Sequence, residues 1–306
     1  GDVIANDHPL FFGQVGPRGN PVASRLVRES DLVLALGTRL GFNTTFYTYN
    51  DLPRDADIVQ VDIDGSAVGR YFPVTHGVVA DAGHVADDLA TALSDLDGHV
   101  MPWASRLDEF RQARDELWRD RAEKGAEETV PLKPERVFAE IREVLPREAI
   151  VTLDAGTMCL QATDQLVYHL PPALLTPLDF GLVGFSYAAG LGARVAQPDR
   201  PVVSLMGDGG FAMTMSEITT AVQSGIKTVA VVLDNGCWGA EKSYQRDFYN
   251  GRYIGCDVLN PPYDHVARLC GGEGYKAERP GEVAEALKAA LASEKAAVVH
   301  VKVDPD

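Results

Sequence analysis

Short apolar runs alternate with amphipathic stretches along the first hundred positions of the chain. The runs at residues 31–38, 57–64 and 76–81 have the length and the apolar character of buried strands. Residues 85–96 carry valine or leucine at every third or fourth position, which predicts a helix. Strands that alternate with helices indicate a parallel sheet covered by helices.

Residues 103–124 form a long, highly charged stretch with scattered apolar side chains. This composition predicts an exposed amphipathic helix. A linker is expected after it, at residues 125–134. We therefore predict two domains, residues 1–125 and 126–306, and a chain of 306 residues is long enough for each of them to bury an apolar core.

The second half of the chain repeats the alternation of strands and helices. Pro134 suits the first turn of a helix, and residues 184–196 are a helical stretch rich in small residues, which favours close packing against a neighbouring backbone. The fold class is therefore α/β, with two domains that each contain a mainly parallel sheet flanked by helices. The strands predicted in this half are residues 149–154, 201–208, 228–235 and 296–303.

Composition argues against several classes of partner. The chain has 44 acidic and 28 basic residues, and its net charge of -16 would repel a nucleic-acid backbone. No apolar run approaches the roughly 18 residues that a membrane span requires. The first residues lack the basic and apolar regions of a signal peptide, and the four cysteines form neither a C-x-x-C pair nor a dense disulfide spacing. We expect a cytoplasmic protein that acts on a small molecule, without nucleic acid or membrane.

The clearest chemical signal is Gly207-Asp208-Gly209-Gly210 at the end of a predicted strand, followed by a helical stretch and by a strand that ends at Asn235. In a right-handed βαβ unit these two strands are parallel, so their carboxyl ends lie at one edge of the sheet. Asp208 and Asn235 should therefore converge. The glycines leave room for a diphosphate to approach backbone N–H groups.

A carboxylate at this edge would repel an anion unless a cation lies between them. Mg²⁺ prefers carboxylate, amide and phosphate oxygens in an octahedral shell. The pair Asp208 and Asn235 therefore predicts a Mg²⁺ ion that carries a diphosphate.

At these residues the chain resembles the thiamine diphosphate-dependent enzymes, whose signature is GDG followed, some two dozen residues later, by NN. Asp234 replaces the first asparagine of that pair, and Asn235 matches the second, which is the family's metal ligand. The resemblance implies thiamine diphosphate and Mg²⁺ as cofactors. It also implies that Asp208, Asn235 and the backbone carbonyl of Cys237 are the metal ligands, although Cys237 could equally be a small residue in a loop.

Two further segments support the resemblance. Asp154-Ala155-Gly156 follows another predicted strand, where the family has a diphosphate loop, and Gly181-Leu182-Val183-Gly184-Phe185 matches a segment on which the family's cofactor bends. Val183 would then be the apolar wedge under the cofactor, although a core valine would also suit that position. The residues implied in cofactor binding are Asp154, Gly156, Gly181, Val183, Gly207, Asp208, Gly209, Gly210, Phe211 and Asn235.

The first domain resembles the middle domain of acetolactate synthase-like members of the superfamily. The similarity lies in residues 31–39, 56–64 and 76–81. In relatives this domain binds FAD, ADP or nothing, and we find no dinucleotide fingerprint in it here. The resemblance thus implies a vestigial nucleotide-binding fold at residues 1–125 and a domain that binds the diphosphate and Mg²⁺ at residues 126–306.

Two other functional classes fit parts of the pattern. Gly207-x-Gly209-x-x-Ala212 satisfies the loose Rossmann pattern, with Asp234 as the ribose-binding acid, which would make the protein an NAD-dependent dehydrogenase. The acidic Asp208 inside that loop argues against this interpretation. An inactive structural subunit would keep the fold and lose the ligands, and the presence of Asp208 and Asn235 argues against that alternative.

The reaction class implied by thiamine diphosphate is the cleavage or formation of a bond beside a carbonyl. Residues 198–255 resemble sulfoacetaldehyde acetyltransferases, which convert sulfoacetaldehyde and phosphate to acetyl phosphate and sulfite. Trp238, Glu241 and Lys242 would then face the substrate, and Lys242 and Arg246 could neutralise a sulfonate or phosphate. Equally, the aromatic residues here could be packing residues and the charges a solvated face. An acetolactate synthase-like carboligase or a 2-oxo acid decarboxylase is the alternative within the superfamily.

The catalytic acid of the resembling family lies outside the segments that match here. That family takes a glutamate, which activates the cofactor, from a pyrimidine-binding domain that precedes the middle domain. Glu217 and Glu241 lie beside the diphosphate strands and would face the wrong half of the cofactor. We therefore expect a pyrimidine-binding domain or subunit as a partner, within a homo- or hetero-oligomeric dimer or tetramer, and no turnover by this chain alone.

Overall fold

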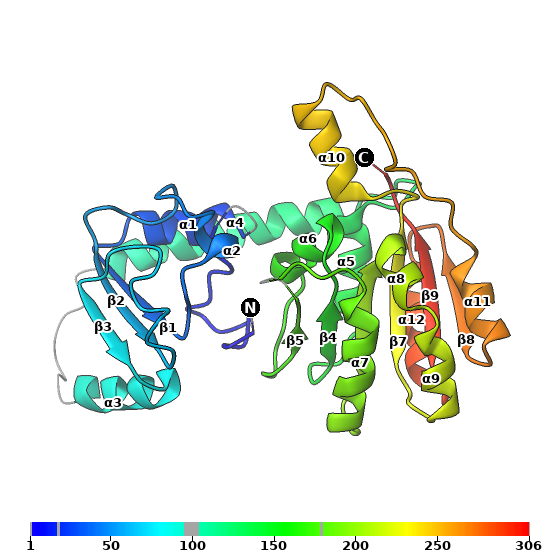
Figure 1. Cartoon of the computed structure of the whole chain (residues 1–306), viewed down its shortest axis with the longest axis horizontal. Coiled ribbons are helices and arrows are strands. Elements are labelled where there is room, and N and C mark those ends of the chain that lie inside the picture. The colour runs from blue at the N-terminus through cyan, green and yellow to red at the C-terminus, as the bar shows by residue number, and fades with distance from the viewer. Residues whose placement is uncertain (1, 17–18, 95–103, 178–179, 306) are drawn as a thin grey trace. The chain divides into compact units, whose positions relative to one another are not determined.

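A computed structural model of the protein describes residues 2–16, 19–94, 104–177 and 180–305 (Figure 1). The chain divides into two compact units, one of which is Phe12–Trp118. The other combines Gly1–Phe11 with Arg119–Asp306. Each unit contains a parallel sheet with helices around it, so the predicted α/β class is confirmed. The domain boundary expected at residue 125 stays a prediction.

The smaller unit contains the three strands predicted in the first hundred residues. β1 (Leu32–Leu36), β2 (Asp57–Asp62) and β3 (His76–Val79) form a parallel sheet in the order β1-β2-β3. Its helices are α1 (Pro21–Arg28), α2 (Phe42–Thr45), α3 (Ala82–Ser94) and the first part of α4 (Ala104–Gly125). The helices predicted at residues 85–96 and 103–124 correspond to α3 and α4, with Leu96 and Trp103 outside the described residues.

The expectation that these three strands are buried is wrong in part. β2 buries Ile58, Gln60 and Val61, whereas all four residues of β3 are exposed and β1 exposes Leu32 and Leu34. The reason is that β1 and β3 are the edges of a three-stranded sheet, and that α3 buries none of its residues. Continuous apolar character therefore did not guarantee two covered faces here.

The larger unit contains a parallel sheet of six strands within the described residues, in the order β5-β4-β6-β7-β9-β8. Four of the strands lie where the sequence predicts them, and β5 and β8 are additional. Their bounds are β4 (Ile150–Leu153), β5 (Leu174–Leu175), β6 (Val202–Gly207), β7 (Val229–Asp234), β8 (Glu273–Ala277) and β9 (Ala297–Lys302).

Helices cover both faces of this sheet (Figure 1). One apolar cluster joins the strands to α5 (Pro134–Val144), α6 (Thr157–Gln165) and α12 (Glu282–Ala292). The other joins them to α7 (Phe185–Ala196), α8 (Asp208–Thr214), α9 (Glu217–Gln223) and α11 (Tyr263–Leu269). Leu205 and Val231 belong to the first cluster, and Met206 and Val232 to the second. This alternation along buried strands explains why their sequences are continuous apolar runs.

Helix α7 confirms the interpretation of its small residues. A Cβ atom on Gly190 would lie 2.1 Å from the hydroxyl oxygen of Ser204 in β6, so only glycine permits this approach. The helix therefore packs directly on the strand that leads to Asp208.

The strand order reverses around β4. β5 pairs with one side of β4, and the chain then crosses over so that β6 pairs with the other side. Ligand sites in such sheets lie outside the carboxyl ends of the strands at this reversal. A ligand site is therefore expected at the ends of β4, β6 and β7.

Within the part of the chain that the structure describes, no helix has the length and apolar character needed to cross a membrane. All four cysteines are free, and three of them are buried.

Candidate functional site

Three aspartates follow or end the central strands of the larger sheet. Asp154 follows β4, Asp208 follows β6 and Asp234 ends β7. All three are buried, with at most 2% of their surface exposed. Buried carboxylates need hydrogen bonds or counter-charges, so the partners of each one indicate what it does.

Asp154 holds the start of helix α7. Its carboxylate accepts hydrogen bonds from the backbone N–H groups of Gly184 and Phe185, each at 2.9 Å. Burial raises the pKa of Asp154, although these hydrogen bonds act in the opposite direction. The side chain thus connects the end of β4 to the segment that contains Val183, and its predicted contact with the cofactor stays a prediction.

The predicted glycines fall into two groups. A Cβ on Gly210 would lie 2.0 Å from the Asp154 carboxylate, so this glycine is required by packing inside the protein. By contrast, a Cβ on Gly156, Gly181 or Gly207 would meet nothing within 4 Å. Gly156 and Gly181 have φ angles of +125° and +70°, which favour glycine on their own account. Gly207 has an ordinary φ of -75°, so neither strain nor packing explains it, and the open space beside it suits the close approach of a ligand.

Asp208 accepts hydrogen bonds only from neutral donors among the described residues. The backbone N–H groups of Gly209 (2.9 Å) and Gly236 (3.0 Å) and the side-chain amide of Asn260 (2.6 Å) donate to it. Burial raises the pKa of Asp208 to about 6, although the bond from Asn260 acts to lower it. A cation near this carboxylate would therefore stabilise its charged form.

Asp234 is the centre of a buried polar network that the sequence did not reveal. Its carboxylate meets His300 Nε2 at 2.7 Å, accepts a hydrogen bond from Asn260 Nδ2 at 2.9 Å and pairs with the ammonium group of Lys302. Burial acts to raise the pKa of Asp234, but the hydrogen bonds from His300, Lys302 and Asn260 outweigh burial and hold that pKa below its usual range. Asp234 is thus charged and balanced, and Asn260 joins it to Asp208.

Sequence signals for this network were weak but present. His300 and Lys302 interrupt the apolar run of β9, and the strand register pairs them with Val232 and Asp234 of β7. A polar residue inside a buried strand calls for a partner. Asn260 and Tyr263 lie in a segment without a recognisable motif, and Tyr263 donates to the backbone carbonyl of Asp208 at 3.1 Å.

Asn235 and Cys237 follow β7 in a loop anchored at several points. Asn235 Oδ1 accepts a hydrogen bond from the N–H of Cys237 at 3.2 Å. Trp238 donates its backbone N–H to the carbonyl of Cys256 at 2.7 Å, which fixes the loop. Burial raises the pKa of the Cys237 thiol, so the group is protonated at neutral pH and unsuited to nucleophilic chemistry.

The described residues contain no group of three or more His, Cys, Asp or Glu that could hold a metal ion. A cation here would therefore depend on amide, carbonyl and ligand oxygens beside Asp208.

Two protein families match parts of this chain. The family described as "Thiamine pyrophosphate enzyme, C-terminal TPP binding domain" matches residues 154–301, which contain all three strand ends. The family described as "Thiamine pyrophosphate enzyme, central domain" matches residues 1–89. The chain belongs to the thiamine diphosphate-dependent enzyme superfamily. Thiamine pyrophosphate is another name for thiamine diphosphate, so the superfamily identifies the cofactor.

Curated relatives extend the similarity over nearly the whole chain. Sulfoacetaldehyde acetyltransferase from Castellaniella defragrans is 33% identical over 308 residues, which cover 95% of this chain and 52% of the relative. The enzyme of the same name from Alcaligenes xylosoxydans xylosoxydans is 31% identical over 95% of this chain and 52% of the relative. A Methanocaldococcus jannaschii protein named "Probable acetolactate synthase large subunit" is 30% identical over 98% of this chain and 51% of the relative. The chain spans about half the length of these relatives.

The structure leaves the dehydrogenase alternative without its ribose-binding residue. The Rossmann interpretation needs Asp234 to bind a ribose, but the side chain of Asp234 is fully buried and occupied by His300 and Lys302. Neither oxygen of the Asp234 carboxylate is free to face a nucleotide.

The remaining predicted site residues have different surroundings. The ring of Trp238 packs on Gly209, where a Cβ would lie 2.6 Å from it. Phe211 is fully buried and contacts Tyr187 and Tyr263 edge-on, so only its backbone could reach a ligand. Glu241 is exposed on α10 (Gly239–Phe248). The predicted substrate contacts of Trp238 and Glu241 remain predictions.

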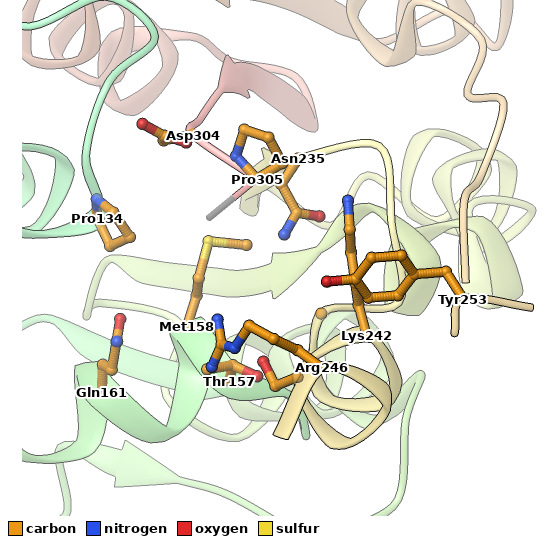
Figure 2. Close-up of a pocket in the computed structure, with 12 residues that line it drawn as sticks. Pro134, Thr157, Met158, Gln161, Asn235, Lys242, Arg246, Tyr253, Asp304 and Pro305 are labelled. Atoms are coloured by element: carbon orange, nitrogen blue, oxygen red, sulfur yellow. The ribbon is translucent and has the colours of Figure 1, made fainter. Parts of the chain in front are cut away.

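A cavity of about 230 Å³ lies beside Asn235 (Figure 2). Its walls are formed by α6, α10 and the residues that follow β9. Lys242, predicted to face the substrate, lines this cavity, and so does Arg246. The lining residues are Pro134, Thr157, Met158, Gln161, Asn235, Gly239, Lys242, Ser243, Arg246, Tyr253, Asp304 and Pro305.

Proposed function

We propose that this chain binds thiamine diphosphate through a Mg²⁺ ion held by Asp208, Asn235 and the backbone carbonyl of Cys237. The observation that supports it most is the buried carboxylate of Asp208, whose described hydrogen-bond donors are all neutral and whose pKa burial raises to about 6. Mg²⁺ would supply the missing positive charge, and oxygen ligands are those it prefers. Gly207 leaves space beside it for the diphosphate.

The surrounding residues position these ligands. β6 and β7 are adjacent and parallel, with Gly207 in register with Leu233, so Asp208 and Asn235 emerge at the same edge. Asn260 and Tyr263 hold the side chain and the backbone carbonyl of Asp208, respectively. Such outer contacts orient metal ligands in advance of binding.

The reaction proposed is the transfer of an acetyl group from sulfoacetaldehyde to phosphate. When bound, thiamine diphosphate supplies a nucleophilic carbon and an electron sink for chemistry beside a carbonyl. Sulfoacetaldehyde and hydrogen phosphate yield acetyl phosphate and hydrogen sulfite, so a C–S bond breaks and a C–O bond to phosphate forms. The relatives named sulfoacetaldehyde acetyltransferase support this choice.

An acetolactate synthase-like carboligase is the second candidate. It is favoured by the 30% identity to the Methanocaldococcus jannaschii protein over 98% of this chain. Pyruvate would then be both donor and acceptor. A 2-oxo acid decarboxylase would use the same donor without an acceptor, but no contact in the described site favours it.

Turnover is proposed to need a pyrimidine-binding domain or subunit beyond these 306 residues, within a cytoplasmic dimer or tetramer. Glu241 is exposed on α10 and Glu217 is only partly buried in the first turn of α9, so neither is held in a buried site suited to proton transfer. A positioned acid–base group is worth roughly 10²–10⁴ in rate. Free cysteines are consistent with a reducing compartment.

The test is a steady-state assay of the 306-residue chain and of the longest native form of the protein, each with saturating thiamine diphosphate and Mg²⁺. We expect acetyl phosphate and sulfite in equal amounts from the longer form, and neither from the 306-residue chain. Acetolactate from pyruvate without sulfite would select the second candidate. Equal turnover by the two forms would refute the need for another domain.

A further inference from the structure

Asp234 is a buried carboxylate with hydrogen-bond donors on both of its oxygens. Oδ1 accepts from the backbone N–H of Gly236 at 3.0 Å and from the side-chain amide of Asn260 at 2.9 Å. Oδ2 contacts Nε2 of His300 at 2.7 Å and the ammonium group of Lys302. An ionised carboxylate only accepts hydrogen bonds, so His300 carries a proton on Nε2. Each of these contacts therefore requires an acceptor at position 234.

Two of the same donors also hold Asp208. The N–H of Gly236 lies 3.0 Å from Asp208 Oδ2, and Nδ2 of Asn260 lies 2.6 Å from the same oxygen. Oδ1 of Asp208 accepts only from the N–H of Gly209 among the described residues. The NH₂ group of Asn260 thus lies between two carboxylates, where it holds Oδ2 of Asp208 and leaves Oδ1 as the less occupied oxygen of the proposed metal ligand.

The loop around Asn260 offers little packing that could fix the orientation of its side chain. Asn260 is only partly buried, and the preceding Leu259 is 99% exposed. The Tyr263 hydroxyl lies 3.0 Å from Asn260 Oδ1, and a hydroxyl can donate or accept, so it tolerates either orientation of the amide. The two carboxylates do not, because an amide oxygen turned toward them would meet only acceptors. The carboxylates therefore determine which end of the Asn260 amide points inward.

An asparagine at position 234 could not serve both of its sides. Its single oxygen would face either Asn260 or Lys302, and its NH₂ group would meet the donors on the other side. The ammonium group of Lys302 carries a full charge and attracts the oxygen more strongly than a neutral amide does. The NH₂ group would then face Asn260, whose amide would have to turn over or move away from Asp208.

We propose that Asp234 is a positioning residue for the metal site, which acts on Asp208 through Asn260. Its two acceptor oxygens satisfy Lys302 and Asn260 at the same time, so Asn260 keeps its NH₂ group on Asp208. Asp234 in β7 is in register with Lys302 in the adjacent strand β9 (Figure 1). A strand that supplies none of the proposed ligands thereby influences the metal site. This inference rests on the proposed function, because the site that it concerns is the proposed Mg²⁺ site.

The first measurement is titration calorimetry of the 306-residue chain with thiamine diphosphate, with and without Mg²⁺. Asp234→Asn should weaken Mg²⁺-dependent binding by about tenfold, as expected for residues that orient metal ligands. Asn260→Ala should weaken it by a similar factor. Lys302→Met should weaken it less than about threefold, because Lys302 is 44% exposed and exposed ion pairs are weak.

The double variant Asp234→Asn with Lys302→Met separates positioning from a general loss of structure. Without the ammonium group, Nε2 of His300 can accept from the NH₂ group at position 234. The ring proton then moves to Nδ1, which lies 3.6 Å from an Asp264 oxygen that has no hydrogen-bond partner among the described residues. The amide oxygen can face Asn260 again, so the double variant should bind within about threefold of Lys302→Met. A distorted loop after β7 would not be repaired by a change in β9.

The second measurement needs neither metal nor cofactor. Nuclear magnetic resonance of the metal-free chain with isotope-labelled asparagine follows the side-chain amide of Asn260, whose signal Asn260→Ala identifies by its loss. We expect the N–H protons of this amide to be protected from exchange with water in the parent and in the double variant, and unprotected in Asp234→Asn.

The proposal is overturned if Asp234→Asn binds as tightly as the parent, or if the double variant binds no better than Asp234→Asn. Should Asp234→Asn fail to fold, the double variant decides, and its failure to fold or to bind overturns the proposal as well. Failure of the proposed function looks different: the parent then shows no Mg²⁺-dependent binding of thiamine diphosphate. Protection of the Asn260 amide still decides in that case whether Asp234 orients it.

Discussion

The two sheets of this protein differ in how completely helices cover them. Every residue of β7 is buried, and β6 and β9 are buried except for their last residues, whereas β3 exposes all four of its residues. The covered strands lie between two apolar clusters. The buried aspartates Asp154, Asp208 and Asp234 lie where these strands end. The smaller sheet has the same parallel topology, but its edge strand β3 lacks such a covering layer.

Two aspartates at strand ends, one in each sheet, show how the surroundings of such a residue differ between the two units. Asp62 ends β2 in the smaller sheet and accepts a hydrogen bond from Asp64 N–H at 2.9 Å, so it stabilises a local turn. Asp208 follows β6 and is held by residues 28 and 52 positions away in sequence, Gly236 and Asn260. The residue type is the same, and the surrounding tertiary contacts create the difference.

The largest expected effect concerns this pair of aspartates. Asp208→Ala should weaken Mg²⁺-dependent binding of thiamine diphosphate by at least about a hundredfold, because the cation loses its only proposed carboxylate ligand. Titration calorimetry with and without Mg²⁺ measures this. Asp62→Ala is the matched control and should bind the cofactor as the parent does. Equal affinities in the parent and Asp208→Ala would remove the proposed metal site.

The difference in burial predicts a difference in stability. Leu205→Ala in β6, where the side chain is 1% exposed, should lower the free energy of unfolding by about 2–5 kcal/mol. Leu34→Ala in β1, where the side chain is 46% exposed, should cost less than about 1 kcal/mol, since much of that surface already contacts water. Urea denaturation followed by circular dichroism compares the two. Similar losses would show that the smaller sheet is as well covered as the larger one.

The network around Asp234 predicts an intermediate effect. Asp234→Asn removes the negative charge of the carboxylate that His300 and Lys302 contact. Hydrogen bonds to charged groups are worth about 1.5–3 kcal/mol each. The free energy of unfolding should fall by about that amount, as measured by urea denaturation at pH 7. Asp62→Asn, which loses no cationic partner among the described residues, provides the reference. An unchanged midpoint in Asp234→Asn would mean that the network does not depend on charge.

The smallest expected effect is a pH dependence at Asp154. Burial raises its pKa above the ordinary 3.8, so the folded state binds this proton more tightly than the unfolded state does. Stability contributed by this group is therefore full below pH 3.8 and declines as the pH rises through the folded pKa. Asp154→Asn does not titrate, so its stability relative to the parent should improve from pH 4 to pH 7. Chemical denaturation at both values measures the difference, and a constant or opposite difference would contradict the assigned direction.

The α/β class, the four long strands of the larger sheet and the position of Asp208 and Asn235 could all be predicted from the amino-acid sequence. These features follow from local rules: buried strands are continuous apolar runs, and parallel strands place their carboxyl ends at one edge. Pro134 correctly predicted the start of α5 for the same reason, since its fixed φ suits a first helical turn. The short β5 and the polar, half-exposed β8 lack the apolar runs that made the other strands visible.

The polar residues that contact one another could not be predicted in this way, because the fold brings them together from distant parts of the chain. Asn260, Tyr263 and His300 lie 52, 55 and 66 positions from their partners, and no local pattern announces such contacts. The tertiary structure also separated Gly210, which packing against Asp154 requires, from Gly207, which faces open space. Burial and the pairing of distant charges depend on the whole fold, so they determine the pKa values and the open edge on which the proposed chemistry depends.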